Sequence, residues 1–171
     1  EIIQEAKEEG RKVIVFSFYL DTIRKISKLL GNQCTEIING SVSPKHRQEI
    51  IDEFESAPAG SVLLSQIMAG GTGLNIQSAS VVIICEPQIK PSIESQAISR
   101  TYRMGQSRNV LVYRLLCNDT IDERITDILT RKTNVFNAFA DQSAAVNNIE
   151  IDSTSLTNMI DEERKRIMNL S

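Results

Sequence analysis

The sequence predicts an α/β fold: a doubly wound parallel sheet with helices on both faces, followed by a C-terminal helical extension. Near-continuous apolar runs of strand length alternate along the chain with stretches of helical periodicity. Strands that are apolar on both faces need a helical layer on each side, and strand–helix alternation produces parallel neighbours. The apolar runs are Val13–Phe18, Ser61–Ser65, Val81–Cys85 and Val110–Leu116, with a weaker run at Thr35–Asn39.

The intervening helices carry start and stop signals. The apolar stripe within Ile23–Leu30 is followed by Gly31, a residue suited to ending a helix. Ser43 before Pro44 predicts a helix start, because serine caps free N–H groups and proline fits the first turn. Further helices are expected from Ser92 and from the capping-box pattern Thr120–Glu123.

The pattern changes after residue 132. Asp141–Ile151 is polar and rich in small residues, which is typical of a linker, and Ser153–Leu170 has the pattern of a charged helix. We therefore expect one lobe at residues 1–132 and a helical extension with a linker at residues 133–171. Because the chain opens at Glu1 within a helical pattern, we expect an N-terminal part of the protein to precede it.

Composition places the chain among ordinary globular proteins. It has 171 residues, 41% hydrophobic and 24% charged, and no apolar run reaches the ~20 residues of a membrane span. Its net charge of −3 neither supports nor excludes a nucleic-acid partner, since a few Arg, Lys and backbone N–H groups suffice to bind phosphate.

The cysteines and the histidine argue against a metal centre. Cys34, Cys85 and Cys117 lie far apart without a CxxC pair, and we expect buried, reduced thiols and an intracellular location. No Cys/His cluster is present, so no metal site is predicted. His46, the single histidine, is expected to face solvent.

A glycine-rich segment, Ser65–Ile76, follows one predicted strand. Glycines allow close approach of the backbone, and N–H groups at a helix start suit a phosphate. The segment lacks the Lys-Ser/Thr of the P-loop pattern and departs from the dinucleotide fingerprint. On spacing alone, a phosphate cradle and a plain tight turn are equally open.

A second candidate segment is Gln96–Gln106. On a helix of about 100° per residue, Gln96, Arg100 and Arg103 form one stripe, and the neighbouring apolar stripe can face the sheet. Two guanidinium groups on one face suit a polyphosphate. From geometry alone, a solvated charged face remains the alternative.

Taken in order, these segments resemble the C-terminal helicase lobe of the SNF2 family, in helicase superfamily 2. The resemblance covers Arg11–Lys132 and implies a RecA-like fold. The matching blocks are KVIVFSFYLDTIRKISKLL, INGSVSPKHRQEIIDEF, LLSQIMAGGTGLNIQSASVVI, QAISRTYRMGQ and VLVYRLLCNDTIDERI.

The resemblance implies a role for several residues. Arg100 and Arg103 take the positions of arginine fingers, which stabilise negative charge as a phosphoryl group is transferred. The positions that match nucleotide-side residues are Gly73, Asn75 and Gln96. The positions that match contacts to the nucleic-acid backbone are Ser17, Gly40 and Ser65, with Arg47 and Thr72 as further candidates.

It also implies partners and a location. ATP and Mg²⁺ would be bound mainly by an N-terminal lobe of the same parent chain, and the pair of lobes would move along double-stranded DNA as a translocase. The present lobe alone is expected to be inactive. The location would be the bacterial nucleoid in the cytoplasm or the eukaryotic nucleus, with no membrane.

Two segments depart from the family pattern. Glu86–Pro91 stands where the family has Asp-x-x-Trp-Asn-Pro, so the tryptophan and asparagine are missing. Ser65–Met68 replaces the usual Ser-Thr-Arg, which removes a basic residue and predicts weaker DNA affinity. Two other functions stay open: a non-enzymatic nucleic-acid-binding or scaffold module, and a small nucleotide-binding α/β protein.

Overall fold

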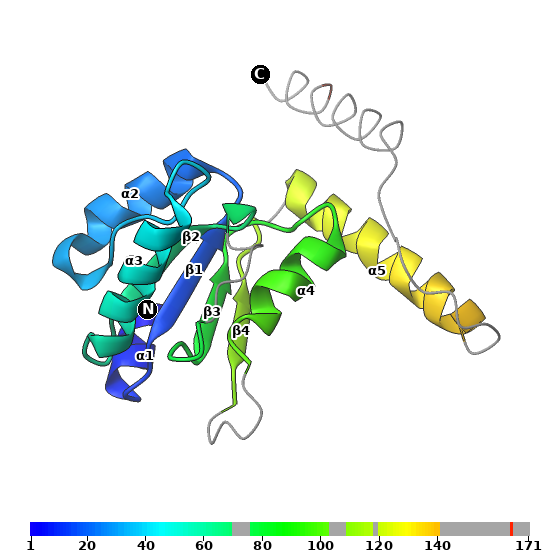
Figure 1. Ribbon diagram of the computed structural model, residues 1–171. Coiled ribbons are helices and arrows are strands. Elements are labelled where there is room, and N and C mark those ends of the chain that lie inside the picture. Colours follow the sequence, from blue (N-terminus) through cyan, green and yellow to red (C-terminus); the bar gives the residue numbers. More distant parts are fainter. Residues whose placement is uncertain (70–75, 103–108, 118–119, 141–164, 166–171) are drawn as a thin grey trace. The chain divides into compact units, whose positions relative to one another are not determined.

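The computed structural model describes residues 1–69, 76–102, 109–117, 120–140 and 165, with the backbone alone for 131–140. Strands and helices alternate along the chain (Figure 1). The elements are α1 (Ile2–Glu8), β1 (Val13–Ser17), α2 (Leu20–Leu30), a 3-10 turn (Gly31–Gln33), α3 (Pro44–Ser56), β2 (Val62–Gln66), β3 (Val81–Ile84), α4 (Pro91–Ser99), β4 (Leu111–Arg114) and α5 (Ile121–Ala140).

The four strands form one parallel sheet in the order β2-β1-β3-β4. Ser17 pairs with Gln66 on one side of β1, and Phe16 pairs with Ile84 on the other. The four strong apolar runs are thus confirmed as strands. The weak run Thr35–Asn39 is not a strand, and Ile38 makes only an isolated bridge to β2.

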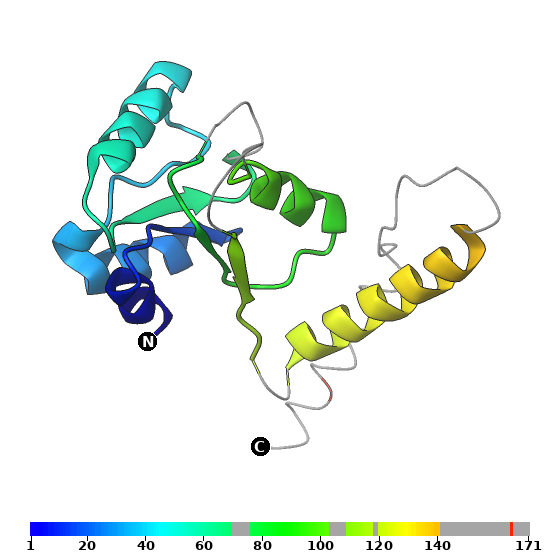
Figure 2. The same cartoon turned by 90° about the horizontal axis from the view of Figure 1, so that it is seen from below.

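The strands β1, β2 and β3 bury both faces, as their near-continuous apolar sequences predict, whereas β4 is half-buried and ends at the exposed Arg114. Residues of β1 alternate between two cores: Ile14 and Phe16 face α3 and α4, whereas Val13 and Val15 face α1 and α2. Figure 2 shows these two helical layers on opposite sides of the sheet. The predicted doubly wound architecture is confirmed.

The predicted helix signals also hold. Gly31 follows α2 with φ 53°, and the Ser43 hydroxyl accepts the N–H of His46 at 3.3 Å. At the start of α5, the Thr120 hydroxyl accepts the N–H of Asp122 at 3.3 Å. These contacts satisfy N–H groups that a helix leaves without partners at its start.

Contact density divides the chain into two compact units. One comprises Glu1–Glu86 with Ile93–Leu115, and the other comprises Pro87–Ser92 with the chain from Leu116 onward. Within the second unit, Ile125 is buried among neighbouring apolar residues of α5. Because α5 runs without interruption to Ala140, the boundary after residue 132 stays a prediction. The predicted linker and the final helix lie outside the described residues, apart from Lys165.

Within the described part, no helix combines the length and apolar character of a membrane span.

Lys12 links the sheet to the end of α3. Its ammonium donates to the carbonyls of Phe54 at 2.9 Å and Glu55 at 2.6 Å. We predict that Lys12→Met lowers the free energy of unfolding by about 1–3 kcal/mol, because these carbonyls lose a charged donor. Chemical denaturation measures the change. Lys45→Met, at a lysine side chain that is 90% exposed, serves as the control and should shift stability by less than about 0.5 kcal/mol. Equal losses in the two variants would contradict the capping role.

Candidate functional site

The carboxyl ends of the parallel strands lie along one edge of the sheet. The chain leaves β1 toward β2 and leaves β3 toward β4, so its direction reverses between β1 and β3. In open α/β sheets, ligands bind in the crevice outside the carboxyl ends at this point of reversal. The topology therefore predicts a binding site at the residues that follow Ser17 and Ile84, where β1 and β3 end (Figure 1).

Glu86 joins the strand ends at this edge. Its carboxylate accepts the Ser17 hydroxyl at 3.0 Å and also the backbone N–H of Phe18. The Gln66 amide, at the end of β2, donates to the Phe18 carbonyl at 3.0 Å. The sequence marked Glu86 only as a departure from a family pattern. Its position directly after an apolar strand was the signal that could have identified it as a strand-end residue.

Cys85, which directly follows β3, has an unreactive thiol. Burial raises the pKa of the Cys85 thiol to about 12, and the neighbouring Glu86 charge adds to the effect. The thiol is therefore protonated near neutral pH and is a poor nucleophile. All three cysteines are free, but Cys117 is exposed. The expectation of a buried thiol is wrong there, because Cys117 follows the end of β4.

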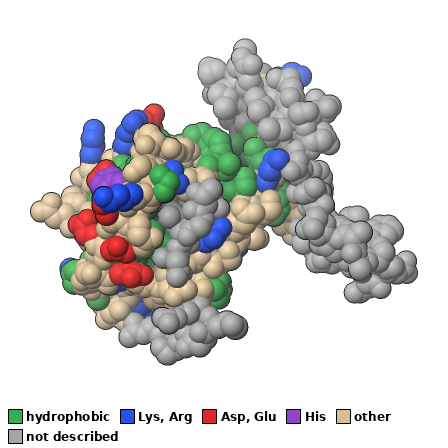
Figure 3. All heavy atoms as spheres, in the orientation of Figure 1, with side chains coloured by type: hydrophobic (Ala, Val, Ile, Leu, Met, Phe, Trp, Pro, Cys, Tyr) green, Lys and Arg blue, Asp and Glu red, His purple; other side chains and the backbone are tan. Residues whose placement is uncertain are grey.

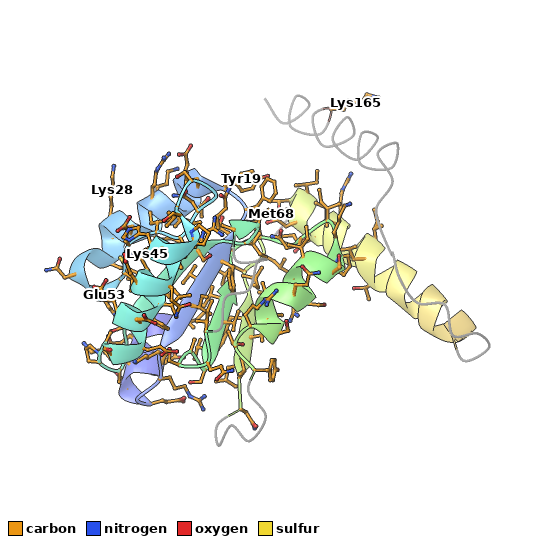
Figure 4. The ribbon with its side chains drawn as sticks, in the orientation of Figure 1. Tyr19, Lys28, Lys45, Glu53, Met68 and Lys165 are labelled. Carbon is orange, nitrogen blue, oxygen red and sulfur yellow. The ribbon has the colours of Figure 1, made fainter. Side chains whose placement is uncertain are left out.

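Apolar side chains are exposed beside the strand ends. Phe18 and Tyr19 are 47% and 60% exposed and form an edge-to-face pair with ring centroids 5.5 Å apart. Met68, two residues beyond β2, is 53% exposed. Figure 4 shows Tyr19 and Met68 on the side of the molecule where the strands end. This edge thus presents exposed aromatic and apolar side chains.

The predicted nucleic-acid residues fall into two groups. Ser17 and Ser65 are 0% exposed, and the Ser65 hydroxyl donates to the carbonyl of Gln66 at 3.3 Å. Gly40 is exposed, and a Cβ added to it would meet no atom within 4 Å. Thr72 lies outside the described residues. Among the described glycine and serine candidates, Gly40 alone offers an open surface, and the predicted contacts stay predictions.

The Arg47 guanidinium bonds to backbone carbonyls. It donates to Val42 at 2.8 Å, to Asn39 at 3.2 Å and to Ala69 at 3.2 Å. Ala69 immediately precedes the glycine-rich residues, so one side chain links the end of the β2 region to the turn after Ile38. Its predicted contact with nucleic acid is untested.

The expected helical stripe does not extend from Gln96 to Arg100, because α4 ends at Ser99. The N–H groups of Arg100 and Thr101 bond to carbonyls three residues earlier, at 3.3 and 3.0 Å, which tightens the last turn. Gln96 is exposed and Arg100 is half-buried. Arg103, Gly73 and Asn75 lie outside the described residues.

A long-range bond brings the two candidate segments together. The Ile76 N–H, directly after the glycine-rich residues, donates to the Arg100 carbonyl at 3.0 Å. The sequence placed both segments in the site without indicating that they touch.

His46 belongs to an exposed network away from these bonds. Its ring nitrogens lie 3.0 Å from Glu49 and 2.9 Å from Glu36, and these hydrogen bonds, led by that with Glu49, raise its pKa. Figure 3 shows acidic and basic side chains interspersed around the histidine. The solvent-facing expectation is confirmed, with the His46 side chain 44% exposed. Within the described residues, no group of His, Cys, Asp and Glu forms a metal site.

The family of the helicase conserved C-terminal domain matches residues 1–105. A protein of Mycoplasma pneumoniae, described as an uncharacterized ATP-dependent helicase, is 39% identical over 134 residues. That match covers 77% of this chain and 13% of the relative, so the chain spans a small part of the proteins it resembles.

Two solved structures are similar. The C-terminal part of the Fun30 ATPase domain has a TM-score of 0.70 at 24% identity, covering 95% of this chain and 49% of that one; it supports the fold alone. The SWI2/SNF2 ATPase core domain of Sulfolobus solfataricus has a TM-score of 0.64 at 31% identity, covering 84% and 29%. The RecA-like expectation is confirmed.

Because Glu86 accepts bonds from the last residue of β1 and from the residue that follows it, Glu86→Ala should lower the free energy of unfolding by about 1–3 kcal/mol. Glu86→Gln, which keeps one amide oxygen as acceptor, should lose less. Urea denaturation provides the measurement. Glu53→Ala, at an exposed position of α3, is the control, with an expected change within about 0.5 kcal/mol. Full stability of Glu86→Ala would show that the carboxylate does not hold the strand ends.

Proposed function

Because this chain belongs to the helicase conserved C-terminal domain family and is the C-terminal helicase lobe of an SNF2-family protein, we propose that its parent is an ATP-driven translocase on double-stranded DNA. The chain contributes Arg100 and Arg103 as arginine fingers and forms part of the DNA track. An N-terminal lobe of the same parent binds ATP and Mg²⁺. The observation that carries this proposal is the backbone hydrogen bond from the Ile76 N–H to the Arg100 carbonyl, which brings the two candidate segments together.

That bond supports a nucleotide-facing role for the sheet edge. Residues 70–75 are flanked by Ala69 and Ile76. The Ala69 carbonyl accepts a hydrogen bond from the Arg47 guanidinium, and the Ile76 N–H donates to the Arg100 carbonyl. Gly73 and Asn75 therefore lie between two anchored flanks, close in sequence to a residue bound to Arg100. Flanking residues that are fixed by hydrogen bonds need little reorganisation when charge develops on a nearby phosphate.

The chemistry available to this chain is charge stabilisation. When bound, ATP with Mg²⁺ supplies the phosphoryl group whose transfer to water drives the motor. The chain lacks the P-loop pattern, and its described residues form no carboxylate cluster for the metal, so both fit a site held mainly by the other lobe. The guanidiniums of Arg100 and Arg103 would approach as the lobes close.

The DNA track is proposed along the same edge. The open backbone at Gly40 permits close approach of a phosphate, and the exposed rings of Phe18 and Tyr19 offer surface directly after β1. The proposed track also includes Ser17, Ser65, Thr72 and Arg47. Each of them either contacts the DNA backbone or supports a residue that does. Closing and opening of the lobes around ATP would then move this track along the duplex.

The test uses the full-length parent protein and measures ATP hydrolysis with and without double-stranded DNA. We predict that Arg100→Ala and Arg103→Ala each leave ATP binding nearly intact and lower turnover by about 10³–10⁵-fold, as loss of an arginine finger does. Arg24→Ala is the control, since Arg24 pairs with Asp21 on exposed α2.

The same assay is applied to the isolated chain, which is expected to hydrolyse no ATP. Hydrolysis by the isolated chain, or unchanged turnover in both arginine variants, would refute the proposed role. DNA binding by the parent without any hydrolysis would instead favour a scaffold function.

A further inference from the structure

The Arg47 side chain contacts four backbone carbonyls from two separate segments. Nε donates to Val42 at 2.8 Å, and one terminal nitrogen donates to Ala69 at 3.2 Å. The other terminal nitrogen donates to Asn39 at 3.2 Å and to Gly40 at 3.5 Å. All three guanidinium nitrogens are thus used within the protein.

The two segments held by Arg47 are the two that the proposed function needs to coordinate. Asn39–Val42 forms a turn that exposes Gly40, and the Asn39 side chain fixes it by accepting the Ser41 N–H at 2.8 Å. Ala69 leads into residues 70–75. The turn contains the proposed DNA contact Gly40, and residues 70–75 include the proposed nucleotide contacts Gly73 and Asn75.

The geometry of the contacts depends on the planar guanidinium. Its donors point in fixed, divergent directions, whereas a lysine ammonium is a compact charge at the end of a flexible stem. Moving the guanidinium onto a phosphate would withdraw donors from half-buried carbonyls, and leaving such groups without partners is costly. The observed bonds therefore favour an internal role over direct contact with DNA.

We propose that Arg47 is a positioning residue that couples the Gly40 turn to the entrance of the glycine-rich segment, so that DNA engagement and nucleotide contact change together. This inference rests on the proposed translocase function. It assigns Arg47 an effect on turnover through Gly40 and Ala69, without a contact of its own to phosphate.

The experiment compares Arg47→Lys and Arg47→Gln in the full-length parent protein, with Lys45→Gln as the matched control on the same helix. Three quantities are measured: turnover at saturating ATP and double-stranded DNA, the salt dependence of DNA affinity, and amide hydrogen exchange in residues 39–42 and 67–69. Thermal unfolding of each variant is recorded first.

We expect both Arg47 variants to lower DNA-stimulated turnover by about 10²-fold, the size of effect that a small misplacement produces. Exchange should rise in both segments together, while the salt slope of DNA binding stays at the wild-type value. Lys45→Gln should leave turnover and exchange unchanged.

Restored turnover in Arg47→Lys, with a salt slope smaller by about 0.9 in Arg47→Gln, would overturn the proposal, because it would assign a direct phosphate contact. Loss of cooperative folding in both variants would also overturn it and leave Arg47 a folding role alone. If the wild-type parent shows no DNA-stimulated hydrolysis, the proposed function fails, and the exchange experiment still decides whether Arg47 couples the two segments.

Discussion

Parallel pairing of the strands is the constraint on which the site depends. Because β1, β2 and β3 run in the same direction, the residues that follow them meet at one edge, although they are far apart in the sequence. Hydrogen bonds then connect these ends: Glu86 accepts from Ser17 and Phe18 at the end of β1, and the Gln66 amide donates to the Phe18 carbonyl. Without that common direction, the glycine-rich segment and Arg100 would have no reason to be neighbours.

Much of the fold was predictable because its determinants are local. Apolar runs marked the four strands, Gly31 marked the end of α2, and Ser43 marked the start of α3. Alternation of strand and helix implied the doubly wound sheet. The strand prediction for Thr35–Asn39 was wrong because this segment forms only one isolated bridge to β2, at Ile38. Its pattern resembled a strand, but pairing depends on a neighbour that a local pattern does not contain.

The site was less predictable because its determinants are distant. The sequence selected Arg100, but its carbonyl accepts a hydrogen bond from Ile76, which lies 24 residues earlier in the chain. Glu86 and Arg47 likewise act on residues brought close by the sheet. A local helical stripe could not reveal the backbone groups to which these side chains bond, because those groups belong to segments that are distant in the sequence.

The most direct test of the central claim is site-specific photo-crosslinking to double-stranded DNA in the full-length protein. A photoreactive phenylalanine replaces Tyr19, at the carboxyl ends of the strands, or Asn32, beside Gly60 at the opposite edge. If DNA binds at the carboxyl ends of the strands, the Tyr19 position should cross-link to DNA and the Asn32 position should not. Cross-linking from Asn32 alone would contradict the account.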